Sequence, residues 1–406
     1  MKIDELSINK IQLLLIGLSV IAIDLVVFYV LLDQGNAINF VYIASFLLSA
    51  TVLFLLSFAW LPQGSDLRRK RSWSIKFVVL TLMMLFLRGG ILFSFIKIPN
   101  LSLQLAIFFC VMISSAFYFA SSVGVLYLEF YSTNSAGKWR YLFVWILIYS
   151  IILRFSYLGV PELFYEEAYY WNYAKHLDMG YLDHPPMVAW IIALFTNLMG
   201  DNEFAVRFGA FICWFMTAAF LYKLTGLVYN KTKNIQAILL IAVLPAYFAV
   251  GWAMTPDAPL IASWAMALYF FYRALIHESR MAWIGVGLAI GLGMLSKYTI
   301  ALLGIAAFVF MLIDRDARKW LVRPEPYVAI IISLMIFSPV IIWNANHEWA
   351  SFLYQSRDRV ADRFESLPYL IGTIVLIITP TGFLSLIAIL LYRKTIISEN
   401  SVVDYQ

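Results

Sequence analysis

The chain has 406 residues, of which 63% are hydrophobic and only 13% are charged, and its mean hydropathy is +0.83. A soluble core cannot absorb that much apolar surface, so a soluble enzyme or binding domain is excluded. The basic residues behind the net charge of +5 lie mostly in short loops between apolar runs, which indicates membrane topology rather than affinity for nucleic acid.

Apolar runs long enough to cross a bilayer recur along the whole sequence. We place about twelve of them, and therefore expect an all-α polytopic membrane protein with about twelve transmembrane helices. The first run, Ile11 to Leu32, has no Ala-x-Ala-like cleavage site, so it is expected to be a retained span rather than a signal peptide. Cys110 and Cys213 fall inside predicted spans, where packing is favoured over a disulfide or a metal pair.

Basic residues set the expected orientation, because Lys and Arg are enriched in short cytoplasmic loops. The segments expected in the cytoplasm are Arg68 to Arg71, Lys138 with Arg140, Lys231 with Lys233, Arg280, Arg315 to Arg323, and Arg393 with Lys394. Counting spans between them places both termini in the cytoplasm. Three polar segments are then extracytoplasmic: Pro161 to Asn202, the loop at Pro256, and Asn344 to Ser366. We expect an integral protein of a bacterial inner or plasma membrane.

Residues 131–140, YSTNSAGKWR, form a polar linker between two predicted modules. Residues 1–130 hold four predicted spans, and residues 141–406 hold eight more together with almost every candidate site residue. Arg88 is the main intramembrane charge of the first module. It could snorkel toward the outer interface or contact the phosphate of a lipid that passes through the module.

The segment 164–190, FYEEAYYWNYAKHLDMGYLDHPPMVAW, is a polar and aromatic island in an apolar chain, and it is where chemistry is expected. Its adjacent carboxylates Glu166 and Glu167 could be catalytic or could favour the start of an interfacial helix. Asp183 and His184 precede two prolines, which could aim these side chains or simply form a turn. Tyr170 and its aromatic neighbours could stack on sugars or belong to the interfacial aromatic belt.

Two later segments bring further polar groups to the same side of the membrane. Asp257, in Thr-Pro-Asp-Ala-Pro, could belong to the site or cap the helix that follows. The apolar run Met281 to Asp314 would be roughly 50 Å long as one helix, and it has basic loops at both ends. We therefore predict a helical hairpin with Lys297 at its tip, at the depth of a lipid phosphate.

The spacing of His176, Asp178, Asp183 and His184 matches no strong metal-ligand pattern. We expect neither a metal nor another cofactor.

Six motifs in the second module are each similar to motifs of one known family. They are FYEEAYYW (164–171), GYLDHPPMVAW (180–190), EFAVRFGA (203–210), WAMTPDAPL (252–260), GLGMLSKYT (291–299) and WNANHEWASFLYQ (343–355). In this order they resemble the lipid-phosphate-dependent glycosyltransferases of the GT-C superfamily, specifically the dolichyl-phosphate-mannose protein mannosyltransferase-like group. The family usually has Asp-Glu where this chain has Glu166-Glu167, so its carboxylate at position 166 lies one methylene further from the backbone.

The resemblance implies a GT-C-like fold with extracytoplasmic interfacial helices and a sugar donor linked to a polyprenyl phosphate, such as undecaprenyl phosphate. Glu166 occupies the position of the family's catalytic acidic residue and is the first choice for the base. Glu167 is the second choice, and Asp257 is implied as a second acidic site residue. The resemblance implies that Arg207, Asp183, His184 and Tyr170 position the substrate. Arg207 matches the family motif, but it could equally anchor its span at the interface.

The chemistry follows from the donor. Phosphate leaves as a stable anion without a general acid, whereas a carboxylate must take the proton of the acceptor hydroxyl on the opposite face, which inverts the anomeric centre. Cations stabilise the departing phosphate. Lys297 suits that role, with Arg357, Arg359 and Arg363 from the last outer loop as helpers.

The first module is similar to the GtrA-like four-span proteins through residues 10–32, 44–63 and the basic loop 68–71. This similarity implies that the module binds, retains or flips the lipid-linked donor, and a docking or structural role is the alternative. The expected function is an inverting membrane hexosyl- or pentosyltransferase acting on the extracytoplasmic face, in cell-surface glycan or lipid modification, with a glycan, lipid or protein as acceptor. The alternatives are a polyprenyl-phosphate-sugar transporter without transfer activity, and a non-catalytic scaffold.

Overall fold

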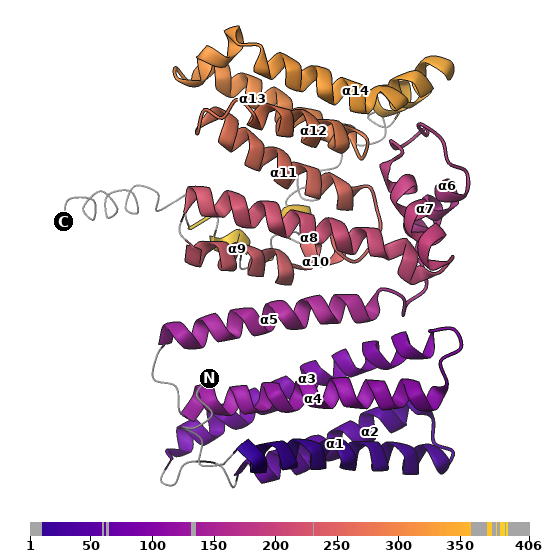
Figure 1. Ribbon diagram of the computed structural model, residues 1–406, viewed down its shortest axis with the longest axis vertical. Helices are drawn as coiled ribbons and strands as arrows, with labels where there is room; N and C mark the ends of the chain where they lie inside the picture. Colours follow the sequence, from indigo (N-terminus) through magenta and orange to yellow (C-terminus); the bar gives the residue numbers. More distant parts are fainter. Residues whose placement is uncertain are drawn as a thin grey trace, which may run out of the picture. The chain divides into compact units, whose positions relative to one another are not determined.

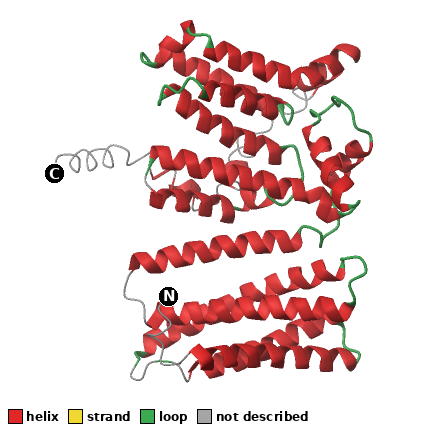
Figure 2. Ribbon diagram, viewed as in Figure 1, coloured by secondary structure: helices red, strands yellow, loops and turns green. Residues whose placement is uncertain are grey.

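A computed structural model of the protein describes residues 10–58, 61, 65–130, 135–229, 231–358, 372–375, 379, 382–385 and 387–388. Among these residues the secondary structure consists of helices and the loops that join them, as predicted for an all-α membrane protein (Figure 2). Within a bilayer, an α-helix satisfies all its backbone hydrogen bonds inside one segment of the chain, which explains this architecture.

The chain divides into two compact units, Met1–Glu162 and Leu163–Gln406 (Figure 1). The helices of the first are α1 Lys10–Asp33, α2 Ile38–Phe58, α3 Leu67–Ile96, α4 Leu103–Phe130 and α5 Ser135–Tyr157. The helices of the second are α6 Tyr165–Lys175, α7 Met187–Met199, α8 Glu203–Val228, α9 Lys231–Val243, α10 Pro245–Val250, α11 Asp257–Leu275, α12 Ala282–Met294, α13 Ala301–Ile313, α14 Glu325–Asn346 and α15 Ala350–Leu353.

In the described residues, eight helices are long and apolar enough to cross a membrane, and four shorter apolar helices accompany them. Large apolar side chains such as Leu14, Val26 and Phe86 are exposed on these helices, which fits contact with lipid rather than with water. Cys110 and Cys213 are free and buried, each in a hydrophobic core, and this confirms the packing positions predicted for them. The count of about twelve spans and their orientation stay predictions.

Helix α5 packs on α3 in the first unit. The hydroxyl of Tyr149 donates a hydrogen bond to the backbone oxygen of Met83 at 2.8 Å, and that of Tyr157 donates to the oxygen of Phe86 at 2.8 Å. Gly90 permits this approach, because a Cβ there would lie 2.4 Å from the Tyr157 ring. The compact unit thus extends past the linker predicted at 131–140, and the modules 1–130 and 141–406 stay predictions.

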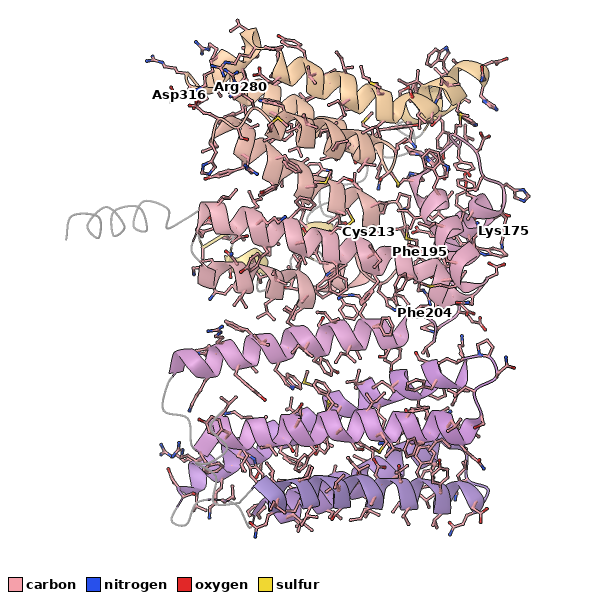
Figure 3. The ribbon with its side chains drawn as sticks, viewed as in Figure 1. Lys175, Phe195, Phe204, Cys213, Arg280 and Asp316 are labelled. Atoms are coloured by element: carbon pink, nitrogen blue, oxygen red, sulfur yellow. The ribbon has the colours of Figure 1, made fainter. Side chains whose placement is uncertain are left out.

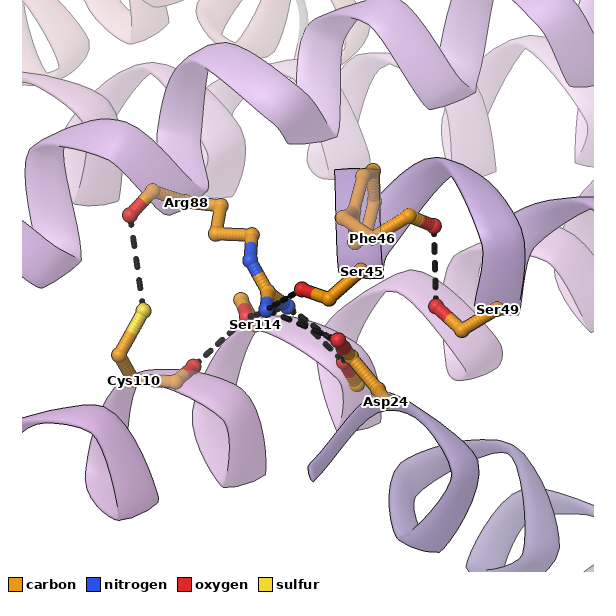
Figure 4. A network of polar contacts seen from close by, with 8 residues as sticks. Asp24, Ser45, Phe46, Ser49, Arg88, Cys110 and Ser114 are labelled. Atoms are coloured by element: carbon orange, nitrogen blue, oxygen red, sulfur yellow. Dashed lines mark hydrogen bonds and ion pairs between the residues drawn. The ribbon is translucent and has the colours of Figure 1, made fainter. Parts of the chain in front are cut away.

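A buried ion pair connects the helices of the first unit (Figure 4). Arg88 on α3 donates two hydrogen bonds to Asp24 on α1, at 2.6 and 2.9 Å, and both side chains are 0% exposed. Arg88 also donates to Ser45 on α2 at 3.2 Å and to Ser114 on α4 at 3.3 Å, while Ser115 donates to Asp24 at 2.6 Å. Arg88 therefore neither snorkels to the interface nor is open to a lipid phosphate, because Asp24 neutralises it inside the bundle.

Replacing Asp24 by Asn is expected to destabilise the first unit. The substitution leaves the Arg88 guanidinium charged and buried without its carboxylate. We expect the free energy of unfolding to fall by about 1–3 kcal/mol, a modest loss because the unfolded helices also remain in lipid. Thermal or SDS-induced unfolding of the detergent-solubilised protein measures the change. Asp33→Asn, at an exposed position of the same helix, is the matched control. Equal stability of the two variants would show that the ion pair contributes nothing.

The second unit contains the predicted hairpin. Helices α12 and α13 are separated at Leu295–Ile300, and Lys297 lies in the break. The other ends of the two arms meet, because Lys319 after α13 pairs with Glu278 before α12 at 2.5 Å. Arg280 at the same end pairs with Glu325 of α14 at 3.4 Å. Figure 3 shows Arg280 and Asp316 at the same end of these helices. The prediction of a hairpin with Lys297 at the tip is confirmed.

Helix α12 is the centre of the second unit, packed between α11 and α14. Glycines make the contact with α14 close: a Cβ on Gly287 would lie 2.7 Å from the backbone oxygen of Ala329, and one on Gly291 would lie 2.8 Å from Ile336. Small residues allow helices to approach where lipid supplies no hydrophobic drive for association. The resulting tight stack fixes the position of the hairpin tip.

Candidate functional site

One polar cavity of about 370 Å³ lies in the second unit. It collects side chains from the start of α6, the loop before α7, the start of α11 and the hairpin tip. The lining residues are Tyr165, Glu166, Tyr169, Tyr170, Asp183, His184, Thr255, Pro256, Asp257 and Lys297. Six of the residues that we selected from the sequence are among them: Glu166, Tyr170, Asp183, His184, Asp257 and Lys297.

Glu166 and Glu167 take different positions although they are adjacent. Both lie in the first turn of α6, where the helix dipole favours a negative charge. Successive helical residues are about 100° apart around the axis, so only one of the two can face the cavity. Glu166 is exposed and lines the cavity, whereas Glu167 is buried and is not part of its lining.

Glu167 pairs with Arg207 of α8 behind the cavity. The Arg207 Nη2 donates to Oε2 of Glu167 at 2.7 Å and its Nε to Oε1 at 2.9 Å, and both side chains are 0% exposed. The backbone N–H of Met254 donates to the same carboxylate at 3.1 Å, and the guanidinium lies 4.3 Å from the centre of the Trp252 ring. One carboxylate therefore ties α6 to α8 and to the segment that leads into Asp257.

Asp257 and Lys297 form an ion pair within the cavity, with Nζ 3.0 Å from Oδ1. Their side chains are 44% and 30% exposed, so both remain open to a ligand. The capping role offered as an alternative is wrong, because Pro256 is the N-cap of α11 and no side chain makes a cap hydrogen bond there. Asp257 is the first residue inside the helix, where the helix dipole favours its charge while the carboxylate lines the cavity.

Asp183 is oriented by its neighbours. The Tyr173 hydroxyl donates to Asp183 Oδ1 at 2.6 Å and lies 2.5 Å from the Tyr169 hydroxyl, and the side-chain amide of Gln355 donates to the Asp183 backbone oxygen. Burial and the hydrogen bond to Asp183 raise the pKa of Tyr173 well above its usual value. The hydroxyl of Tyr173 thus stays protonated and remains a donor to Asp183.

Tyr170 is a buried wall of the same cavity. Its ring makes an edge contact with His184, with centroids 5.7 Å apart. Burial raises the pKa of Tyr170, and the negative charges of Asp183, Glu166 and Asp257 raise it further. Tyr170 is therefore a neutral hydroxyl in a cavity whose three carboxylates are balanced in part by Lys297.

Helix α6 is anchored at its other end by Asp201. Lys175, which Figure 3 labels, pairs with Asp201 at 2.6 Å, and the Trp171 indole donates to the same carboxylate at 2.7 Å. These two partners lower the pKa of Asp201. Both ends of α6 are thus attached to the segment around α8, which holds Glu166 in place.

The motif 343–355 supports the hairpin tip. Oδ1 of Asn344 accepts hydrogen bonds from the backbone N–H of Ser351 at 3.1 Å and of Phe352 at 3.3 Å, and the hydroxyl of Ser351 lies 2.9 Å from that of Tyr298. The Met187 N–H donates to the Leu295 backbone oxygen at 3.0 Å, which ties the start of α7 to the same tip.

Three predicted phosphate-binding arginines remain untested. Arg359 and Arg363 lie outside the described residues, and for Arg357 the structure describes the backbone but not the side chain. In the described part of the chain, no three His, Cys, Asp or Glu side chains gather as a metal site would require. Asp178, one of the potential ligands considered above, instead accepts a hydrogen bond from the Trp343 indole at 2.9 Å. The expectation of no metal stays a prediction.

Sequence reasoning missed several contributors to the site. Thr255 and Pro256 were inside a quoted motif, and their position next to Asp257 was an available signal. Tyr173 and Gln355 were not assigned to Asp183, because their contacts join residues 10 and 172 positions apart in the chain. Spacing alone does not reveal such pairs.

Comparison with known proteins agrees with the resemblance drawn from the motifs. Residues 183–343 match the family described as dolichyl-phosphate-mannose-protein mannosyltransferase. The remainder, including the segment with GtrA-like similarity, lies outside this match, and the GtrA-like assignment stays a prediction. No solved structure matches the chain.

Curated relatives point in the same direction. The lipid A galacturonosyltransferase of Rhizobium johnstonii is 24% identical over 49% of this chain and 41% of its own length. The lipopolysaccharide core galacturonosyltransferase of the same organism is 28% identical over 48% and 39%. The undecaprenyl phosphate-alpha-4-amino-4-deoxy-L-arabinose arabinosyl transferase of Photorhabdus laumondii is 28% identical over 45% and 35%. The matched part thus spans about two fifths of the relatives' length.

Proposed function

We propose that this chain is an inverting membrane glycosyltransferase that moves a sugar from a polyprenyl-phosphate donor to an acceptor hydroxyl. The observation that carries the proposal is the single cavity that Glu166, Asp257 and Lys297 line together. It offers an exposed carboxylate for the acceptor and a cation for the phosphate, which are the two groups that this reaction needs. The matches to lipid-phosphate-dependent glycosyltransferases support the same reaction class.

The proposed reaction assigns a separate role to each group. The acceptor oxygen bonds to the anomeric carbon, the bond from that carbon to the phosphate oxygen breaks, and Glu166 takes the hydroxyl proton. Attack opposite the leaving phosphate inverts the anomeric centre. Lys297 stabilises the charge on the departing phosphate, and Asp257 orients its ammonium from 3.0 Å. Glu167 acts indirectly, because its pairing with Arg207 fixes α6 against α8.

An extracytoplasmic site and an envelope glycolipid acceptor complete the proposal. The cavity uses the hairpin tip, whereas Arg280 and the 315–323 cluster lie at the other end of the same helices. The rule that basic loops face the cytoplasm supports a cavity on the opposite face. The matched relatives are named for transfer to lipid A and to lipopolysaccharide core, which supports a glycolipid hydroxyl as the acceptor.

The test is transfer of radiolabelled sugar in nanodiscs that contain the purified protein. A panel of undecaprenyl-phosphate sugars is offered as donors and an outer-membrane glycolipid extract as acceptor. Transfer with inversion by the wild type is expected. If no sugar is transferred while labelled lipid crosses the bilayer, the protein is a transporter and the proposal is wrong.

Replacing Lys297 by Ala is expected to lower the transfer rate by about 100-fold, the usual effect of removing one group that stabilises developing negative charge. The same radiolabel assay measures it. Lys223→Ala removes an exposed cation of α8 outside the cavity lining and serves as the matched control, with near-normal transfer expected. A Lys297→Ala variant with the rate of the control would exclude the phosphate role.

A further inference from the structure

A groove in the first unit lies between α3, α4 and α5, and the proposed reaction does not use it. Its volume is about 510 Å³. Its walls are mainly apolar and aromatic, and charged residues stand among them. The lining residues are Ile75, Lys76, Val79, Leu80, Met83, Ser121, Val125, Leu128, Glu129, Lys138, Trp139, Tyr141, Leu142 and Trp145.

The groove has a charged end and an apolar end. Lys76 lies in the first third of α3, Glu129 near the end of α4, and Lys138 near the start of α5, so the three mark the same end of the helices. Met83 and Trp145 lie seven residues further along α3 and α5, about 10 Å deeper by helical rise. The basic segment 68–71, in the first turn of α3, lies at the same end, which the positive-inside rule assigns to the cytoplasm.

Cations outnumber carboxylates at the charged end. Glu129 pairs with Lys76, and its backbone oxygen accepts a hydrogen bond from Arg69 Nη2 at 2.8 Å. The Arg69 guanidinium lies 5.7 Å from the centre of the Phe130 ring, which fixes it beside the end of α4. Among the described residues, Lys138 adds a third cation to Lys76 and Arg69, while Glu129 is the one carboxylate of the groove lining. The charge at the groove end is therefore positive by two.

The groove offers few polar groups inside. The Tyr141 side chain of α5 lies against Gly124 of α4, where a Cβ would be 1.9 Å from the Tyr141 hydroxyl. Ser121, the polar side chain deeper in the groove, accepts a hydrogen bond from the Trp145 indole at 2.8 Å. The interior therefore suits a hydrocarbon chain and not a sugar.

From these contacts we infer that the groove binds one anionic glycerophospholipid of the inner leaflet. An acyl chain lies along Val79, Met83 and Trp145, and the phosphate contacts Lys138 with Arg69 and Lys76 behind it. Basic pockets between transmembrane helices on the cytoplasmic side recognise anionic headgroups in this way. The site is distinct from the polar cavity of the second unit, and it does not depend on the proposed reaction.

Quenching of tryptophan fluorescence tests the inference on the full-length protein. The protein is titrated in detergent micelles with phosphatidylglycerol or phosphatidylcholine brominated on the acyl chain. We expect saturable quenching by phosphatidylglycerol at concentrations about 25-fold below those for phosphatidylcholine, because each of the two excess positive charges is worth about fivefold. The double variant Trp139→Phe with Trp145→Phe removes both indoles of the groove lining and is expected to abolish the saturable part, which places the chain in the groove.

Charge variants provide the control. Lys138→Gln should weaken phosphatidylglycerol binding about fivefold and leave phosphatidylcholine unchanged, while Lys138→Arg should preserve binding. Lys97→Gln, at an exposed position near the opposite end of α3, should have no effect. The inference is overturned if both lipids quench equally, if Lys138→Gln binds like the wild type, or if undecaprenyl phosphate displaces phosphatidylglycerol at lower concentration.

Discussion

Glu166→Gln is expected to lower the rate of sugar transfer by about 10²–10⁴-fold, the usual contribution of a positioned general base. Gln keeps the size and the hydrogen-bonding oxygen of the side chain but cannot accept the acceptor's proton. Glu166 is exposed at the cavity, so the substitution breaks no buried contact and stability should not change. Single-turnover transfer of radiolabelled sugar measures the effect, with thermal unfolding recorded on the same preparation.

Two further variants make this test specific. Glu162→Gln removes a carboxylate just outside α6 and should transfer sugar at the normal rate. Glu166→Asp restores the residue usual at this position in the family and should keep most of the activity. If Glu166→Gln transfers sugar within threefold of the control, the base lies elsewhere, and Asp257 and Asp183 become the residues to replace.

The sequence predicted the parts of the fold that depend on local hydropathy. Lys297 was assigned to a hairpin tip because a single 281–314 helix would be too long for a bilayer, and the structure places the break there. Asp183 and Asp257 were predicted as site residues because they are charged residues near prolines in an otherwise apolar chain. Both line the cavity, together with Glu166. Their catalytic or positioning roles stay predictions.

Ion pairs between side chains of different helices were harder to predict from the sequence. Arg88 was interpreted as a residue directed at the interface or at a lipid, yet Asp24 in the first span carried the signal that was needed. Two opposite charges inside the spans of one module favour pairing, because each is costly alone in lipid. The two side chains meet only inside the assembled helix bundle, and the sequence does not give the arrangement of its helices.

The distinction between Glu166 and Glu167 also required the structure. Two adjacent carboxylates look equivalent in a sequence, and helical rotation alone says that they differ without saying which one is buried. Glu167 is the buried one, because the Arg207 guanidinium on α8 binds its carboxylate. The residue predicted as a substrate contact is thus placed behind the cavity wall.

Glu167→Gln is accordingly expected to reduce stability by about 3–5 kcal/mol, because it leaves the Arg207 charge buried without a partner. The hydrogen bond from Met254 N–H is weakened at the same time, and the segment that leads to Asp257 loses its anchor. Thermal unfolding should therefore show a lower midpoint for Glu167→Gln. The rate of sugar transfer per folded molecule should fall much less.

The double variant Glu167→Met with Arg207→Met separates support from catalysis. It removes both charges and fills the space with apolar side chains, and such replacements of buried pairs are often neutral or stabilising. We expect it to recover most of the stability lost in Glu167→Gln, and to transfer sugar because Glu166 and Lys297 are intact. If the double variant is stable but inactive while Glu166→Gln is active, Glu167 is the base. The buried pair would then have to open during the reaction.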